Sequence, residues 1–142
     1  LGKLYRSVSK FELALVMFQN ALNLEPLRAE IYLLMGEVYY YRSDMAKATS
    51  AYRKAIEIEP DNDQAYHYLG VLQKSLGFHD QSLQSHQKSV EINPNNGVAQ
   101  NNLAVAYFNA KQYDLAEQHS ILANSLGQNM TSLLNRIRVV KD

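Results

Sequence analysis

The only three prolines of the chain are evenly spaced. Pro26, Pro60 and Pro94 each end a similar run of residues, "ALNLEP", "AIEIEP" and "SVEINP", so the same pattern returns at a constant interval. A period of roughly 20 to 50 residues is typical of stacked repeats, in which one repeat cannot bury its apolar face without a neighbour. The period set by the prolines lies in this range. It therefore constrains the fold more than the length does, and it predicts an array of similar elements along the 142 residues.

Each repeat carries the pattern of two amphipathic helices. In residues 29–62 a first apolar stripe has the spacing of an α-helix and consists of Tyr32, Met35, Gly36 and Tyr39. A second stripe with helical spacing consists of Met45, Ala48, Tyr52, Ala55 and Ile56. The polar run "YRSD" between the stripes favours a turn, and Pro60 ends the second helix. Each repeat is therefore predicted to be a helical hairpin.

Two positions of the repeat carry small side chains. The counterparts of Gly36 one period apart are Gly2, Gly70 and Ala104, and those of Ala48 are Ala14, Ser82 and Ala116. A glycine inside a helix costs roughly 1 kcal/mol relative to alanine, so close packing has to compensate for it. We expect the two helices of a pair to run antiparallel with the two small positions facing each other.

These residues resemble the tetratricopeptide repeat. The resemblance rests on Tyr32-x2-Met35-Gly36-x2-Tyr39, Ala48-x3-Tyr52 and Pro60, and it continues into the neighbouring repeats over nearly the whole chain. It implies an all-α fold, a right-handed superhelical solenoid of antiparallel helix pairs. It also implies a concave groove lined by the first helix of each pair, a convex back formed by the second, and a role as a scaffold for protein-protein interaction.

The period divides the chain into five segments. They are a partial first repeat at 1–28, repeats at 29–62 and 63–96, a degenerate repeat at 97–130 and a closing helix at 131–142. The first repeat lacks the opening turns of its first helix, so we expect upstream residues of a longer protein, or else a binding partner, to cover its apolar second helix. Arg138 stands where other repeats have Gly36, Gly70 or Ala104. An ordinary further hairpin would clash there, which predicts a helix that covers the last apolar face. The alternatives are an arbitrary end of the sequence and a degenerate further repeat.

The composition limits the kinds of partner. The chain has 14 Lys and Arg against 14 Asp and Glu, and without net charge no overall field attracts nucleic acid. No apolar run approaches the ~20 residues that span a bilayer, so we expect a soluble chain without membrane insertion. The absence of cysteine fits the cytoplasm and the bacterial periplasm equally, and the compartment stays open.

No motif of catalysis or of cofactor binding is present. The sequence has no phosphate-binding glycine loop, no His-Glu-x-x-His and no nucleophile elbow, which predicts a protein that is not an enzyme and uses no cofactor. His79 and His86 lie two helical turns apart but lack a third ligand, so no metal site is expected. The repeat at 63–96 is the most polar inside, and we expect Gln73 to hydrogen-bond His79 across the helix pair.

A candidate groove follows from projecting each first helix away from its packing stripe. The residues predicted to line it are Lys3, Arg6, Glu37, Tyr41, Gln64, His67, Tyr68, Val71, Lys74, Asn101, Asn102, Val105, Phe108 and Asn109. Tyrosines offer rigid contact area and amides offer hydrogen bonds to a peptide backbone. We therefore expect the partner to be a protein or a peptide, bound as an extended segment or an amphipathic helix. The alternatives are a self-assembly module that forms a homo-oligomer, and an accessory region of a larger enzyme.

Overall fold

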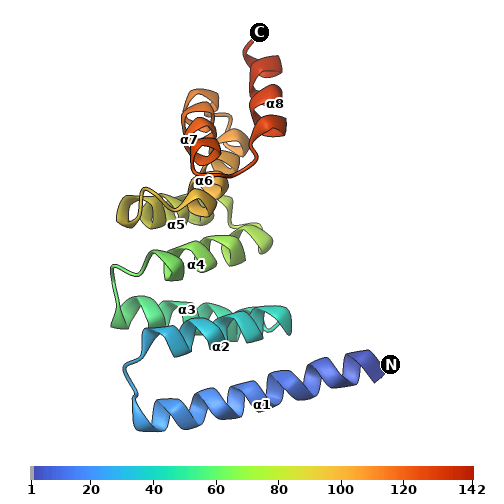
Figure 1. Ribbon diagram of the computed structural model, residues 1–142, viewed down its shortest axis with the longest axis vertical. Helices are drawn as coiled ribbons and strands as arrows, with labels where there is room; N and C mark the ends of the chain where they lie inside the picture. Colours follow the sequence, from blue (N-terminus) through green and yellow to red (C-terminus); the bar gives the residue numbers. More distant parts are fainter. Residues whose placement is uncertain (1) are drawn as a thin grey trace. The chain divides into compact units, whose positions relative to one another are not determined.

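The described part of the chain is entirely helical. The structure is a computed structural model that describes the backbone of residues 2–142 and the side chains from Lys10 onwards. These residues form helices and no strand, which confirms the all-α prediction (Figure 1). The helices are α1 (Gly2–Leu24), α2 (Ala29–Tyr41), α3 (Met45–Ile58), α4 (Asp63–Ser75), α5 (His79–Ile92), α6 (Gly97–Asn109), α7 (Tyr113–Ser125) and α8 (Thr131–Lys141).

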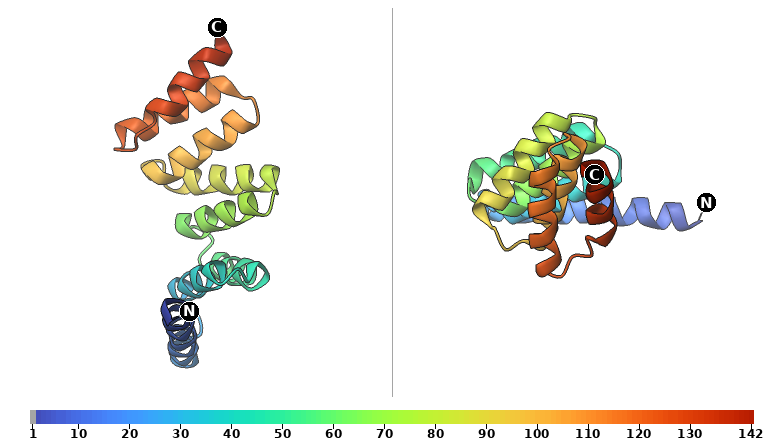
Figure 2. Two further views of the ribbon diagram at one scale, coloured as in Figure 1. Left: turned by 90° about the vertical axis from the view of Figure 1, so that its right-hand side faces the viewer. Right: turned by 90° about the horizontal axis from the view of Figure 1, so that it is seen from above.

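The helices belong to two compact units, each with its own interior. The N-terminal unit ends at Asp61 and contains α1 to α3, whereas the C-terminal unit begins at Asn62 and contains α4 to α8. Within the units, α2 packs on α3, α4 on α5 and α6 on α7, and each pair is a hairpin closed by a short turn (Figure 2). Consecutive pairing is therefore the common building principle of both units.

Similar caps and turns recur with the period that the prolines set. The side chains of Asn62 and Asn96 accept hydrogen bonds from the backbone N–H of the third helical residue, both at 3.1 Å, at the starts of α4 and α6. The turn inside each pair contains a residue with positive φ, namely Ser43 (61°), Gly77 (82°) and Lys111 (60°). First helices thus begin at residues 29, 63, 97 and 131, while the division into repeats stays a prediction.

The first helix departs from the pattern. The sequence predicts a helix pair within residues 1–28, but α1 is one continuous helix of 23 residues, so that prediction is wrong. The sequence of α1 differs from the later repeats at the position where they have the turn between two helices. Lys10 occupies the position of Asp44, whose carboxylate accepts the N–H of Lys47 at 3.2 Å and caps α3. Because an ammonium group cannot accept a hydrogen bond, the same cap is not available at Lys10.

Gly36 and Gly70 each receive an aromatic ring from the second helix of the pair. A Cβ atom added to Gly36 would lie 2.4 Å from Cε1 of Tyr52, and one added to Gly70 would lie 2.7 Å from Cε1 of His86. These distances leave no room for a side chain, which explains why glycine is used despite its low helix propensity. The predicted neighbour Ser82 is also close, because its Oγ donates to the carbonyl oxygen of Gly70 at 2.8 Å.

The last helix closes the interior of the C-terminal unit. Leu133 and Ile137 of α8 are buried together with Leu103, Ala104 and Tyr107 of α6. The sequence predicts Leu134 and Ile137 on the packing stripe of this helix, but Leu133 is the better buried of the two leucines. Arg138 is exposed, so its long side chain avoids the position that small residues occupy in the other pairs.

Candidate partner-binding surface

In the N-terminal unit, two predicted groove residues lie on α2. Tyr41 is 71% exposed, and its ring makes an edge contact with the ring of Tyr40 at a centroid distance of 6.0 Å. Glu37 is half-buried on the same helix. The predictions for Lys3 and Arg6 lie outside the described side chains. Among the described side chains of this unit, Tyr41 is therefore the exposed aromatic residue that is available to a partner.

In the C-terminal unit, the predicted residues lie on α4 and α6. Gln64, Lys74 and Asn109 are exposed, and the others are half-buried: His67, Tyr68, Val71, Asn101, Asn102, Val105 and Phe108. Asp63 connects the start of α4 to the loop before α6. Its carboxylate accepts hydrogen bonds from the amides of Asn93 at 3.2 Å and Asn96 at 2.9 Å. These hydrogen bonds fix the start of α6 relative to the start of α4.

A cavity of about 310 Å³ brings two predicted residues together at the other end of these helices. Lys74 comes from the last turn of α4 and Asn109 from the end of α6. Leu83, Ala106 and Ala110 provide apolar walls, while His79 and Asp80 add polar groups. Neither the ammonium of Lys74 nor the amide of Asn109 has a hydrogen-bond or ion-pair partner among the described side chains. The cavity therefore offers free polar groups beside apolar surface, as ligand pockets do.

Phe108 contributes to the interior as well as to the surface. Its ring lies 5.5 Å from the ring of Tyr113, and Cζ of Arg136 lies 4.5 Å above its centroid. Val105 also packs against the buried cluster that includes Leu133. Arg136 of α8 is a residue of this surface that the sequence reasoning missed. The period contains the signal, because Arg136 follows Asn102 by one period and therefore occupies the same position of the repeat.

The interior behind α4 is polar and contains the buried imidazole of His86 beside the half-buried imidazole of His67. The ring centroids of His67 and His86 are 5.9 Å apart, and neither Nδ1 atom has a hydrogen-bond partner in the described structure. Burial lowers the pKa of both rings, and that of His86 falls to about 4. Both rings are therefore neutral near pH 7.

Gln73 has a different partner from the predicted one. Its Oε1 accepts a hydrogen bond of 2.6 Å from the hydroxyl of Ser85, whereas His79 is exposed, so the predicted Gln73–His79 contact is wrong. Gln100 plays the corresponding part in the next pair. It contacts Nδ1 of His119 through Oε1 at 2.6 Å and donates to the carbonyl of Pro94 at 2.7 Å. Buried amides thus find partners within their own helix pair or its loop.

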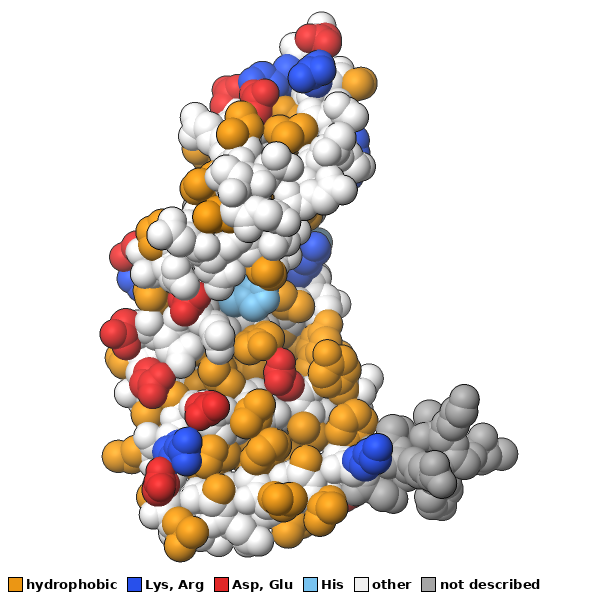
Figure 3. All heavy atoms as spheres, in the orientation of Figure 1, with side chains coloured by type: hydrophobic (Ala, Val, Ile, Leu, Met, Phe, Trp, Pro, Cys, Tyr) orange, Lys and Arg blue, Asp and Glu red, His pale blue; other side chains and the backbone are white. Residues whose placement is uncertain are grey.

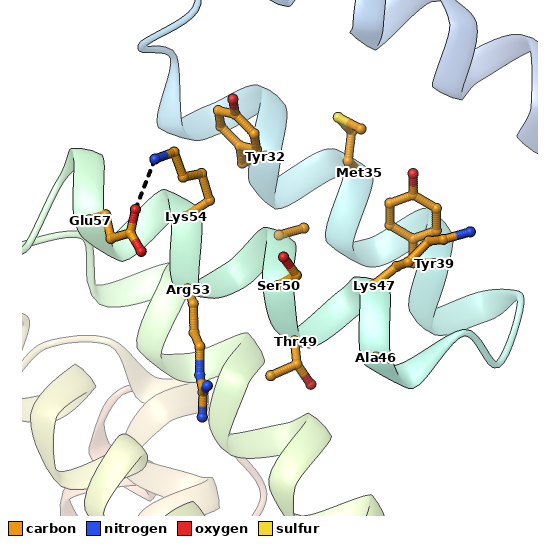
Figure 4. A pocket seen from close by; sticks show the side chains of 11 residues that line it. Tyr32, Met35, Tyr39, Ala46, Lys47, Thr49, Ser50, Arg53, Lys54 and Glu57 are labelled. Atoms are coloured by element: carbon orange, nitrogen blue, oxygen red, sulfur yellow. Dashed lines mark hydrogen bonds and ion pairs between the residues drawn. The ribbon is translucent and has the colours of Figure 1, made fainter.

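A second cavity lies in the N-terminal unit and has a volume of about 680 Å³ (Figure 4). Tyr32, Met35 and Tyr39 of α2 line one side, and residues of α3 line the other. An ion pair of 2.8 Å between Lys54 and Glu57 lies at its edge. Hydrophobic side chains also gather on the face of this unit seen in Figure 3.

The described residues hold neither a metal-binding cluster nor a membrane-spanning helix. Among these residues, no cluster of three or more His, Asp or Glu side chains is arranged to hold a metal ion. None of the described helices combines the length and the apolar character needed to span a bilayer.

The helix pairs and their period define the class of protein. The chain is a helical-repeat protein in which consecutive helix pairs share one constant period. Residues 36–77 match the family described as "TPR repeat", and residues 87–118 match the description "Tetratricopeptide repeat". The chain belongs to the tetratricopeptide repeat family, as its sequence pattern predicts. This family suggests a protein-interaction scaffold, a role that is typically non-catalytic.

Solved structures support the fold independently of these matches. A structure titled "Crystal structure of MamA" matches with a TM-score of 0.74 and 23% identity, over 93% of this chain and 77% of that chain. In total 255 chains of solved structures match, so the likeness identifies a widespread fold and not a particular function. A comparison with curated proteins found no match.

Proposed function

We propose that the chain is a non-catalytic scaffold that binds a peptide or a partner segment along α4 and α6 of the C-terminal unit. The main support is the cavity that Lys74 and Asn109 share, because it joins the ends of two first helices at one place. Side chains on both helices then form a continuous candidate surface, with Tyr68 and Val71 on α4 and Asn102 on α6.

The chemistry of this surface suits an uncharged segment of a partner. Aromatic rings contribute large contact areas at low cost in conformational entropy, and amide side chains can hydrogen-bond a peptide backbone. Lys74 and Arg136 are the cations near this surface in the described structure, so they fix orientation and do not create a strongly basic field. The interaction therefore depends on shape and on hydrogen bonding.

The test removes one aromatic and one amide contact from neighbouring first helices. The Tyr68→Ala, Asn102→Ala double variant is expected to weaken binding at least tenfold, roughly 1.4 kcal/mol. The probe is the tightest peptide selected from a random phage-displayed library against the wild-type chain, and its affinity is measured by titration calorimetry. Circular dichroism checks that the variant retains its helices.

The matched control changes two exposed side chains on the second helices of the same unit. Gln84 on α5 and Gln118 on α7 are exposed and make no hydrogen bond among the described residues. The Gln84→Ala, Gln118→Ala variant should bind the selected peptide with unchanged affinity. Loss of binding in this control, with retention in the groove variant, would place the partner on the outer surface and refute the proposal.

A further inference from the structure

Helix α1 is less buried than its counterparts at three positions of the repeat. Ala14, Phe18 and Ala21 are half-buried. The residues one and two periods later are buried, with relative exposures of 0% for Ala48, 2% for Ser82, 2% for Tyr52, 1% for His86, 0% for Ala55 and 0% for Ser89. Tyr52 and His86 are covered by the glycine-bearing helix of their own pair. No such helix covers Phe18, because α1 has no partner within a pair.

The rest of the α1 surface also lacks charge. Leu13, Val16 and Met17 are exposed by 62%, 55% and 62%, and residues 13–24 include no charged side chain. The side toward α2 is already occupied, since Leu22 belongs to the cluster of Ile31 and Met35, and Leu15, Phe18 and Ala21 reach the same cluster while staying half-buried. A helix that is apolar around most of its circumference is typical of a buried position. Another helix is therefore expected to cover α1.

The sequence indicates which helix fits. In the following pairs the glycine of the first helix packs on an aromatic ring of the second, as Gly36 does on Tyr52 and Gly70 on His86. Gly2 stands one period before Gly36, and Phe18 stands one period before Tyr52. In a continuous helix, however, Gly2 and Phe18 are about 24 Å apart along the axis, so this packing is impossible within one α1.

We propose that two copies of the chain pair through antiparallel α1 helices, so that residues 2–9 of each copy cover Ala14 and Phe18 of the other. In this dimer, the packing of a glycine on an aromatic ring forms between two chains. In the other helix pairs the same packing forms within one chain. Exchange of an identical element is a low-cost route to a closed dimer, because each copy gives and receives the same surface. The two-fold axis would pass near Lys10, midway between Gly2 and Phe18. This inference does not depend on the proposed groove.

The decisive variants act on the missing turn. Ser9 stands one period before Ser43, whose φ is positive, and Lys10 stands one period before the helix cap Asp44. The Ser9→Gly, Lys10→Asp variant should therefore close a hairpin within each chain and convert the dimer to a monomer. The matched Ser9→Ala, Lys10→Ala variant favours the continuous helix and should remain dimeric.

Molar mass is measured by light scattering and by sedimentation velocity at about 1 to 100 µM, since dimerisation depends on concentration. A dimeric wild type and a monomeric Ser9→Gly, Lys10→Asp variant, called the Gly/Asp variant, support the proposal. A wild type that is monomeric throughout, or a Gly/Asp variant as dimeric as the wild type, overturns it. Circular dichroism is recorded for each variant, so that a change in mass is not confused with unfolding.

Two further variants distinguish this exchange from other contacts through α1. The chain has no cysteine, so Lys10→Cys introduces a single thiol that a short bismaleimide should cross-link in the dimer, whereas Gln84→Cys on α5 should not. Val16 stands one period before Ser50 and two periods before Gln84, which are both exposed. Val16→Glu therefore places a charge on the exposed side of α1 and should leave the dimer intact. If Val16→Glu abolishes the dimer while the Gly/Asp variant does not, the exposed stripe is the interface and the exchange is refuted.

Discussion

Replacement of Ile137 by alanine is expected to lower the free energy of unfolding by about 2 to 5 kcal/mol, the usual cost of truncating a large buried aliphatic side chain. Ile137 has 0% relative exposure and belongs to the cluster that includes Leu103 and Tyr107 of α6. The loss combines the transfer free energy of the removed methylene and methyl groups with the cavity left behind. Urea unfolding followed by circular dichroism measures it.

Val139 on the same helix provides the matched control. Its side chain is 76% exposed, so Val139→Ala should change the unfolding free energy by no more than about 0.5 kcal/mol. Deletion of residues 131–142 should have the largest effect, with a lower melting temperature or aggregation, because the cluster around Leu103 and Tyr107 loses its cover. If deletion leaves melting and solubility unchanged, α8 is a dispensable tail and the closing role is wrong.

Acidification is expected to destabilise the C-terminal unit through the buried His86 and the half-buried His67. Burial lowers the pKa of His86 from 6.5 to about 4, and the nearby His67 and Lys74 act in the same direction. Between these values the unfolded chain binds a proton that the folded chain does not. The free energy of unfolding therefore falls as the pH decreases from about 6.5 to about 4, by an amount on the order of 3 kcal/mol from this group. Burial also lowers the pKa of His67, although Asp63 partly opposes the shift.

The variant that tests this effect is His86→Tyr. Tyr52 occupies the same position one period earlier and packs over Gly36, so the space above Gly70 suits an aromatic ring. Unfolding in urea at several pH values between 4 and 8 should show a smaller loss of stability on acidification in the variant than in the wild type. Ile137→Ala is the control, because it should lower stability by a similar amount at every pH. Parallel pH profiles for the wild type and His86→Tyr would contradict the assignment.

The sequence by itself determined the features that depend on local spacing. Three evenly spaced prolines and the small residues around Gly36 and Ala48 specify one constant period, and this period predicts the family and the all-α fold. The starts of α2, α4, α6 and α8 also follow it. These features can be predicted from the sequence because hydrophobic periodicity, proline and capping residues act within one or two turns of a helix.

Only the tertiary structure decided how facing helices meet. The amide of Gln73 pairs with Ser85 and not with His79, and Arg136 lies over Phe108. Gly36 receives the ring of Tyr52, although the sequence suggested contact between small residues. Residues 2–24 form one helix where the repeat pattern predicts two. A periodic pattern identifies the apolar face of a helix, but its contacts depend on the translation and rotation of the neighbouring helix, which are set by packing among residues distant in sequence.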